Sequence, residues 1–162
     1  MRGATLLLGL GFVLASCKDP EMTRADQLLQ LEDWSRAIAL YDHAVQEHPM
    51  VAEARMGLAL ALSGREREAA SAGLDSASRW VAVARNFAIV ERIDTTLSTA
   101  RDRAEALFQA SLCWQREGRV PQARHSAQEA LAAFPGHAPS AQLLGTLSRD
   151  AGDVANAERW FL

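Results

Sequence analysis

Small and apolar side chains recur along this chain at the spacing that places them on one face of an α-helix. Separations of four, three and five residues occur twice, in the sets Ala37, Tyr41, Ala44, Pro49 and Ala123, Ala127, Ala130, Pro135. Residues three and four apart share a helix face, where alanines let a neighbouring helix approach closely. The proline ends each helix, because it lacks an amide hydrogen and clashes with the preceding turn. The pattern predicts two matched helices that each pack against another helix.

A turn and a second helix are predicted upstream of each set. The upstream helices cover residues 23–31 and 104–117, and the turns contain Glu32 in one case and Gly118 in the other. A glycine suits the left-handed conformation that follows a helix C-terminus. Asp33 is a good N-cap for the helix that follows. Each upstream helix, with its turn and the helix that follows, is therefore expected to form a helical hairpin.

The hairpin recurs at a fixed period near the C-terminus. Gly118 and Gly152 are 34 residues apart, and so are Ala123 and Ala157. Asp153 would cap the helix that follows Gly152. A period of this length indicates a solenoid, in which stacked units bury faces that they cannot bury alone.

Residues 79–103 break the period but still indicate a helix. Their apolar positions form a stripe, made of Trp80, Val81, Val83, Ala84, Phe87, Val90 and Ile93. The recurrence at four residues favours helix over strand, and the polar sequence from Asp94 to Thr96 indicates a break and an N-cap. We interpret the segment as one extra helix between repeats or as a strongly diverged repeat helix. It serves either as a core helix or as a lid or docking helix.

These motifs resemble the tetratricopeptide repeat. Residues 104–137 match a complete unit, and residues 18–51 match a nearly complete one in which glutamate replaces the usual turn glycine. Residues 52–78 match as a degenerate unit, and residues 138–162 begin a unit that stops before its last small residue and proline. Residues 79–103 are the segment that fits no unit.

The resemblance implies an all-α fold, a right-handed superhelical solenoid of antiparallel helix pairs with one extra or diverged helix in the middle. It assigns packing and turn roles to Ala25, Ala37, Tyr41, Ala44, Pro49, Ala59, Gly64, Ala69, Ser111, Gly118, Ala123, Ala130, Pro135, Gly145, Gly152 and Ala157. In the degenerate unit, Gly64 is expected at the turn between two helices.

The N-terminus resembles the signal of a bacterial lipoprotein. Arg2 precedes an apolar run over residues 4–15, which is too short to cross a hydrocarbon core of ~30 Å and suits an export signal. The sequence Leu14, Ala15, Ser16, Cys17 that follows is similar to a lipobox, in which the thiol is diacylglycerylated and the chain is cut before the cysteine. An uncleaved anchor and a plain secretory signal are the alternatives.

This resemblance divides the chain into three parts. A signal peptide would cover residues 1–16, a lipidated tether residues 17–22 and the helical domain residues 23–162. Several acyl chains give stable membrane attachment, whereas a single chain binds only marginally. Lys18 stands where enterobacterial lipoproteins of the inner membrane have aspartate, which favours the outer membrane facing the periplasm.

Charge is distributed unevenly along the chain. The 162 residues carry a net charge of −3, yet residues 18–53 hold eight acids against three bases and residues 79–124 hold eight arginines against five acids. The difference reflects either solvated helix faces or a gradient that orients a partner. The net charge and the lack of a basic cluster with interleaved aromatics argue against nucleic acid.

Residue combinations that would indicate chemistry are missing from the sequence. The histidines His43, His48, His125 and His137 lack metal-ligand spacing, and His137 is expected to be solvated in its Pro-Gly-His turn. Phosphate-binding, dinucleotide and nucleophile motifs do not occur. Once Cys17 is acylated, Cys113 has no disulfide partner and is expected to be a small buried or half-buried residue. We therefore expect a non-enzymatic protein with no catalytic residue, metal or cofactor.

The resemblance also implies a concave binding surface lined by the first helix of each pair. Its groove-facing candidates are Met22, Asp26, Met56, Leu60, Phe108, Leu112, Gln142, Thr146 and Arg149. Four apolar members of this set would make a floor suited to an apolar or amphipathic peptide. The alternative is that a helix over residues 79–94 covers the same side chains.

The expected function is a lipid-anchored scaffold or adaptor that binds a periplasmic protein or peptide and assists complex assembly or localisation. One alternative treats the sequence as the N-terminal portion of a longer envelope enzyme or secretion component, because it stops in mid-helix at Leu162. Another is self-association, in which the incomplete last repeat is completed by a second chain.

Overall fold

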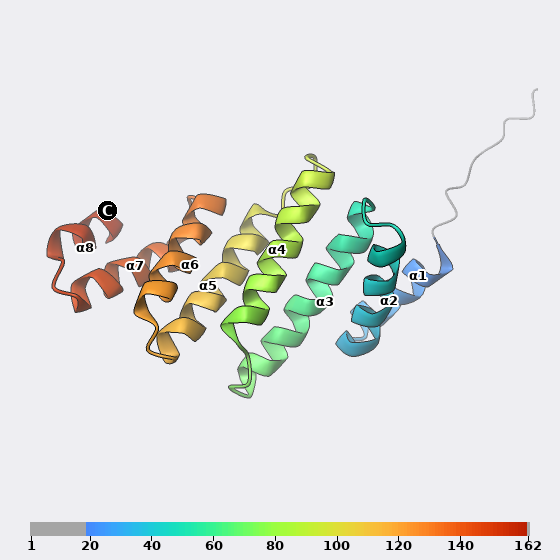
Figure 1. Cartoon of the computed structure of the whole chain (residues 1–162), viewed down its shortest axis with the longest axis horizontal. Coiled ribbons are helices and arrows are strands. Elements are labelled where there is room, and N and C mark those ends of the chain that lie inside the picture. The colour runs from blue at the N-terminus through green and yellow to red at the C-terminus, as the bar shows by residue number, and fades with distance from the viewer. Residues whose placement is uncertain (1–18, 162) are drawn as a thin grey trace, which may run out of the picture.

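Residues 19–161 are described by a computed structural model, in which they form eight α-helices and no β-strand. The helices are α1 (Pro20–Gln30), α2 (Trp34–Glu47), α3 (Ala52–Ser71), α4 (Ala77–Ile93), α5 (Ala100–Arg116), α6 (Val120–Ala133), α7 (Ala138–Asp150) and α8 (Val154–Phe161). Each helix packs against the next, and together they form an extended row of antiparallel hairpins (Figure 1). The all-α solenoid predicted from the sequence is confirmed.

The first helix of every pair is followed by one residue with a left-handed backbone. These residues are Glu32 (φ 57°), Gly73 (φ 69°), Gly118 (φ 73°) and Gly152 (φ 76°). Glycine adopts this conformation freely, whereas a residue with a Cβ atom is strained there. The next helix starts two residues later in three of the four turns. In two of these, Asp33 and Asp153 cap the helix by accepting hydrogen bonds of 3.3 and 3.2 Å from the backbone amides of Arg36 and Asn156. Both N-caps were predicted.

The second hairpin corrects the sequence prediction. α3 continues for 20 residues, and Gly64 lies inside it instead of forming a turn. The turn comes at Gly73, which is 41 residues after Glu32 rather than 34, a difference of seven residues or about two helical turns. α4 is the second helix of this longer hairpin. The unit boundaries at 52–78 and 79–103 are therefore wrong, and the middle segment holds a diverged repeat helix.

Gly64 is in the helix because an aromatic side chain from α2 packs there. A Cβ atom on Gly64 would lie 2.6 Å from Cζ3 of Trp34, and one on Gly57 would lie 2.2 Å from Cε1 of Tyr41. Tyr41 is fully buried, and its hydroxyl donates a hydrogen bond of 2.6 Å to Oδ1 of Asp26 in α1. The two glycines, seven residues apart, thus allow α2 to approach α3 at the expense of helix propensity.

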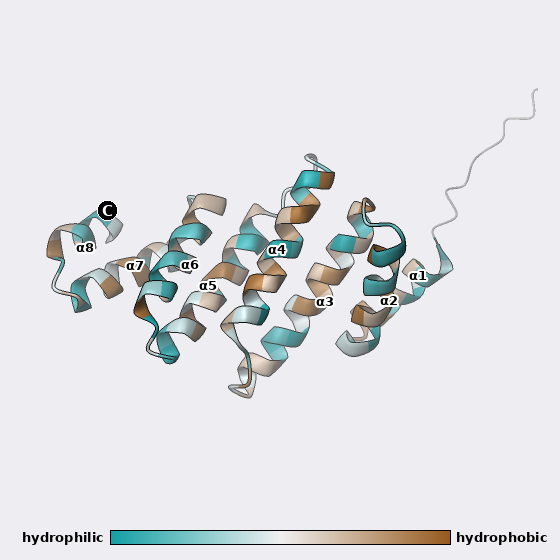
Figure 2. Ribbon diagram, in the orientation of Figure 1, coloured by the Kyte–Doolittle hydropathy of each residue, from teal (hydrophilic) through white to brown (hydrophobic). Residues whose placement is uncertain are grey.

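The buried side chains form three clusters that follow one another along the row. The first joins α1, α2 and α3, the second surrounds Trp80 and Phe87 between α3 and α6, and the third centres on Leu144 of α7. Each unit thus contacts only its neighbours, as in other solenoids. Figure 2 shows hydrophobic and hydrophilic residues mixed along every helix. Within residues 19–161, no helix combines the length with the hydropathy that a membrane crossing needs.

Most of the assigned packing residues are buried between helices. The fully buried ones are Ala25, Ala37, Tyr41, Ala59, Ser111, Ala123 and Ala130. Ala44, Gly145 and Ala157 are also buried, and Ala69 is half-buried near the end of α3. Pro49 and Pro135 are exposed, each two residues after the end of a helix.

A polar network joins the α3–α4 turn to α5. Asp75, whose side chain is 3% exposed, accepts hydrogen bonds from Trp80 Nε1 (3.0 Å), Cys113 Sγ (3.1 Å) and Arg116 Nη2 (2.6 Å). Burial raises the pKa of Asp75, but the hydrogen bonds from Arg116, Cys113 and Trp80 together bring it below its ordinary value. Burial and the neighbouring carboxylate raise the pKa of Cys113 to about 11. Cys113 is therefore a buried thiol that stays protonated at neutral pH, and of these two properties the sequence indicated only the burial.

Candidate functional site

A cavity of about 220 Å³ lies between α5 and α7, which are the first helices of two successive hairpins. Its lining residues are Phe108, Leu112, Pro139, Gln142, Leu143 and Thr146. Phe108 and Leu112 are four residues apart, as are Gln142 and Thr146, so each pair shares a helix face. Four of the nine predicted groove residues are therefore brought together here.

The cavity has an apolar floor and an uncharged rim. Phe108 and Leu112 are half-buried and pack with Leu143 in the third core cluster. At the rim, the Thr146 hydroxyl donates a hydrogen bond of 3.0 Å to the backbone carbonyl of Gln142. α4 does not cover this floor, since the lining residues come from α5 and α7. The surface can hold an apolar side chain of a bound peptide.

His137 lies beneath this surface and not in solvent, so that expectation is wrong. It is 7% exposed, and its ring centroid lies 5.6 Å from that of Phe108. Its Nδ1 lies 2.9 Å from Ser140 Oγ, and its Nε2 lies 3.3 Å from Glu105 Oε2. Ser140 is fully buried, which keeps its hydroxyl away from any substrate. The three side chains link α5 to the start of α7.

The remaining groove candidates lie elsewhere. Met22 is 8% exposed in the first core cluster, and Asp26 accepts the Tyr41 hydrogen bond, so both serve the packing of the first hairpin. Met56 is half-buried against the second cluster. Leu60 is 40% exposed on α3, and Arg149 is exposed at the end of α7. The predicted continuous floor is thus divided between α3 and the cavity at α5 and α7.

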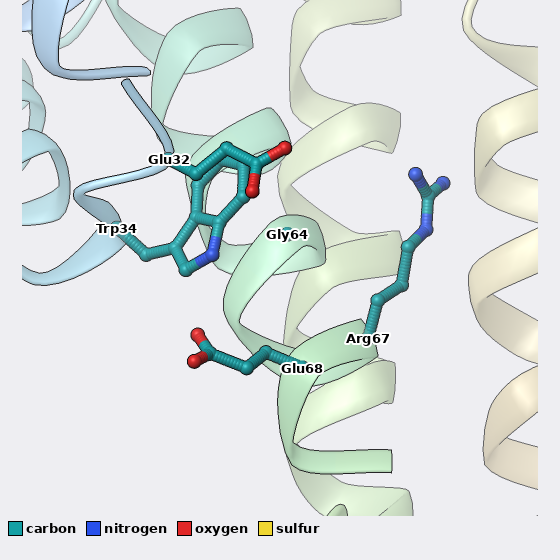
Figure 3. A pocket seen from close by; sticks show the side chains of 5 residues that line it. All are labelled: Glu32, Trp34, Gly64, Arg67 and Glu68. Atoms are coloured by element: carbon teal, nitrogen blue, oxygen red, sulfur yellow. The ribbon is translucent and has the colours of Figure 1, made fainter. Parts of the chain in front are cut away.

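Sequence reasoning missed a larger hollow of about 460 Å³ where α2 meets α3. It is lined by Glu32, Trp34, Gly64, Arg67 and Glu68. Figure 3 shows the Trp34 ring against α3 at Gly64, with Arg67 directed away from it. The only feature of the sequence that could have indicated this hollow is Trp34, directly after the first turn. Its packing partner was not recognised, because Gly64 was assigned to a turn instead of to the interior of α3. The walls are mostly charged side chains, and we assign the hollow no function.

The described residues provide no metal centre. Among residues 19–161, no three histidine, cysteine, aspartate or glutamate side chains converge to hold a metal ion. The lipobox and Cys17 lie outside the described residues, so lipid attachment stays a prediction.

Comparisons with known proteins agree with the hairpin row. A family model described as tetratricopeptide repeat matches residues 22–86 and 115–162, which is more than half of the chain. No curated relative matches the sequence.

Several solved structures are similar to this chain. TTC0263 from Thermus thermophilus, described as a thermophilic TPR protein, is 20% identical, with 89% of this chain and 71% of that chain covered and a TM-score of 0.42. YrrB, described as a TPR protein with an unusual peptide-binding site, is 20% identical (87% and 81% covered, TM-score 0.37). PilW, described as a widely conserved type IV pilus biogenesis factor, is 21% identical (87% and 73% covered, TM-score 0.36).

The family assignment rests on the sequence match, because identities near one fifth and TM-scores below 0.5 describe only general likeness. The match covers the first three helices, the first half of α4 and the last three helices. The chain belongs to the tetratricopeptide repeat family.

Proposed function

We propose that this protein is a non-enzymatic adaptor of the bacterial cell envelope, lipid-anchored through Cys17, that binds a periplasmic protein or peptide on its first-helix surface. The tetratricopeptide fold suggests a protein–protein interaction scaffold. The anchor rests on the lipobox-like sequence that ends at Cys17. Outer-membrane placement rests on Lys18 following it.

The cavity between α5 and α7 is the observation that carries the binding proposal. At about 220 Å³ it is smaller than the ~300–1,000 Å³ typical of small-molecule sites. It has an apolar floor and uncharged rim groups, as an anchor pocket for a peptide side chain would. The partner segment is therefore apolar or amphipathic, with one aliphatic or aromatic residue seated over Phe108 and Leu112.

Site-specific crosslinking in native membranes tests this surface. A photoreactive residue at Gln142, on the cavity rim, is expected to trap one defined partner. The same replacement at Gln128, an exposed glutamine of α6 outside the cavity, is the matched control. Changing Phe108 and Leu112 to glutamate should abolish the adduct while the far-ultraviolet circular dichroism stays helical. Equal capture from both positions, or loss of the fold in the double variant, contradicts the proposal.

The anchor is tested independently with the two cysteines. Cys17→Ser should abolish fatty-acid incorporation and move the protein out of the membrane fraction. Cys113→Ser is the matched control, because Cys113 is buried and hydrogen-bonded within the helical domain. Unchanged fractionation of Cys17→Ser refutes lipidation without affecting the binding surface.

A further inference from the structure

A second groove lies between α4 and α6, which flank α5 in Figure 1. It consists of two cavities of about 240 and 540 Å³ that adjoin each other, since both are lined by Val81 and Glu129, and we treat them as one depression. Ala84 and Ala88 of α4 line the smaller cavity. Because these side chains are small and one helical turn apart, they leave room above α5. We call this depression the α4–α6 groove.

The α4–α6 groove lies on another side of α5 from the cavity described above. Leu112 faces that cavity, while Trp114 lines the α4–α6 groove. Two residues along a helix differ by roughly 200° in direction. The two surfaces can therefore be occupied at the same time by different segments.

The floor of the groove is apolar. Val81 and Leu107 line the smaller cavity, and Val81 and Trp114 line the larger one. Val81 and Trp114 are half-buried, so part of each side chain remains open to a partner. The guanidinium of Arg119 lies 5.2 Å from the Trp114 ring, which holds the indole at the end of the groove.

The two edges of the groove carry opposite charge. Arg85 of α4 lines one side, Glu129 of α6 lines the other, and Arg103 of α5 adds a second positive charge at one end. Within residues 19–161, Arg85 has no carboxylate oxygen within 4.0 Å, and Arg103 only reaches Glu91 at 4.0 Å. Glu129 lies 3.8 Å from His125, and both are exposed. These charges remain available to a bound segment.

The length of the groove defines the size of its occupant. Arg103 and Trp114, at its two ends on α5, are eleven residues apart, which corresponds to about 16 Å or three helical turns. The walls within the described chain are helices, whose backbone groups are already paired, so an extended segment would find no backbone partners there. A helix satisfies its own backbone and needs only side-chain contacts.

We propose that the α4–α6 groove binds an amphipathic helix of a second partner protein, about three turns long. Its apolar stripe covers Val81, Leu107 and Trp114. Acidic residues on one edge of the stripe face Arg85 and Arg103, and a basic residue on the other edge faces Glu129. Complementary charges of this kind select the partner and its orientation.

A designed peptide tests the proposal on the full-length protein. The probe is a 14-residue stapled helix with leucines at positions i, i+4, i+7 and i+11, glutamates along one edge and lysines along the other. In ¹H–¹⁵N spectra it should shift the signals of Val81, Leu107 and the Trp114 indole, leaving Gln142 and Thr146 unchanged. Arg85→Glu should weaken binding by about tenfold, because attraction becomes repulsion.

The controls make each outcome decisive. Arg67→Glu is the same change at an exposed site outside the groove and should leave affinity unchanged. A second peptide has arginine in place of the glutamate opposite Arg85. It should bind the Arg85→Glu variant more tightly than it binds the wild-type protein. Three results would overturn the proposal. They are no binding at 1 mM peptide, equal affinity for a peptide whose glutamate and lysine edges are exchanged, and spectral shifts confined to the α5–α7 cavity. Concentration-dependent self-association that involves Val81 would assign the groove to a second copy instead.

Discussion

Replacing Gly57 by alanine tests how closely α2 packs on α3. The new Cβ atom would lie 2.2 and 2.3 Å from Cε1 and Cζ of Tyr41, so the ring would have to move by more than about 1 Å to reach ordinary contact. The ring cannot move freely, because it is fully buried and its hydroxyl is bonded to Asp26 at 2.6 Å. Overpacking costs about 1–3 kcal/mol, and alanine returns about 1 kcal/mol of helix propensity. We expect a net loss of up to about 2 kcal/mol in the free energy of unfolding.

Gly64→Ala in the same helix is the matched control. Its Cβ atom would approach the Trp34 ring at 2.6–2.7 Å. Trp34 is only half-buried and lines an open hollow, so the indole can rotate aside. The propensity gain is the same, and the net change is expected within about 0.5 kcal/mol of zero. Urea unfolding followed at 222 nm measures both variants. Equal stabilisation by the two substitutions would show that Tyr41 does not pack against Gly57.

Three further substitutions test single features. Glu32→Gly should stabilise the protein by about 0.5–1 kcal/mol, because the left-handed backbone no longer carries a Cβ atom; a lower thermal midpoint contradicts this. Asp75→Asn should remove the stabilisation that the charged Asp75 gives the folded protein. This stabilisation is fully present above the ordinary aspartate pKa and is lost as pH falls through the lower pKa of Asp75 in the folded state. Urea midpoints between pH 3 and 7 should therefore differ least from wild type at the acid end. Ala123→Leu should overpack the fully buried contact of α6 and cost about 1–3 kcal/mol, measured by thermal unfolding; an unchanged midpoint would exclude that contact.

Local signals predicted the regular hairpins correctly. Asp33 and Asp153 cap the helices that follow them, and Gly118 and Gly152 adopt the left-handed turn conformation. These features depend on a few neighbouring residues, so the sequence contains them directly. The apolar stripe that begins at Trp80 likewise predicted a helix, which is α4.

Long-range contacts explain the errors. Glycine occurs both in helix interiors and in turns, so Gly64 alone does not distinguish them. Only the contact of the Trp34 ring of α2 with α3 shows that Gly64 leaves room for a neighbouring helix. His137 has the local sequence of an exposed turn, yet Glu105, 32 residues earlier, and Ser140 hold it in a buried position. The contacts of Trp34 with Gly64 and of His137 with Glu105 join residues about 30 positions apart, and no repeating spacing in the sequence indicates them.

The sequence by itself determined the helix type, the turn chemistry and the family, because helix periodicity, caps and small-residue spacing act over one or two turns. The tertiary structure alone decided the length of the second hairpin and which helix faces remain open. Those outcomes depend on how side chains from different hairpins fill shared space. Phe108 and Leu112 lie under an open cavity, whereas Met22 is buried in the core, because the helices that pack against them differ.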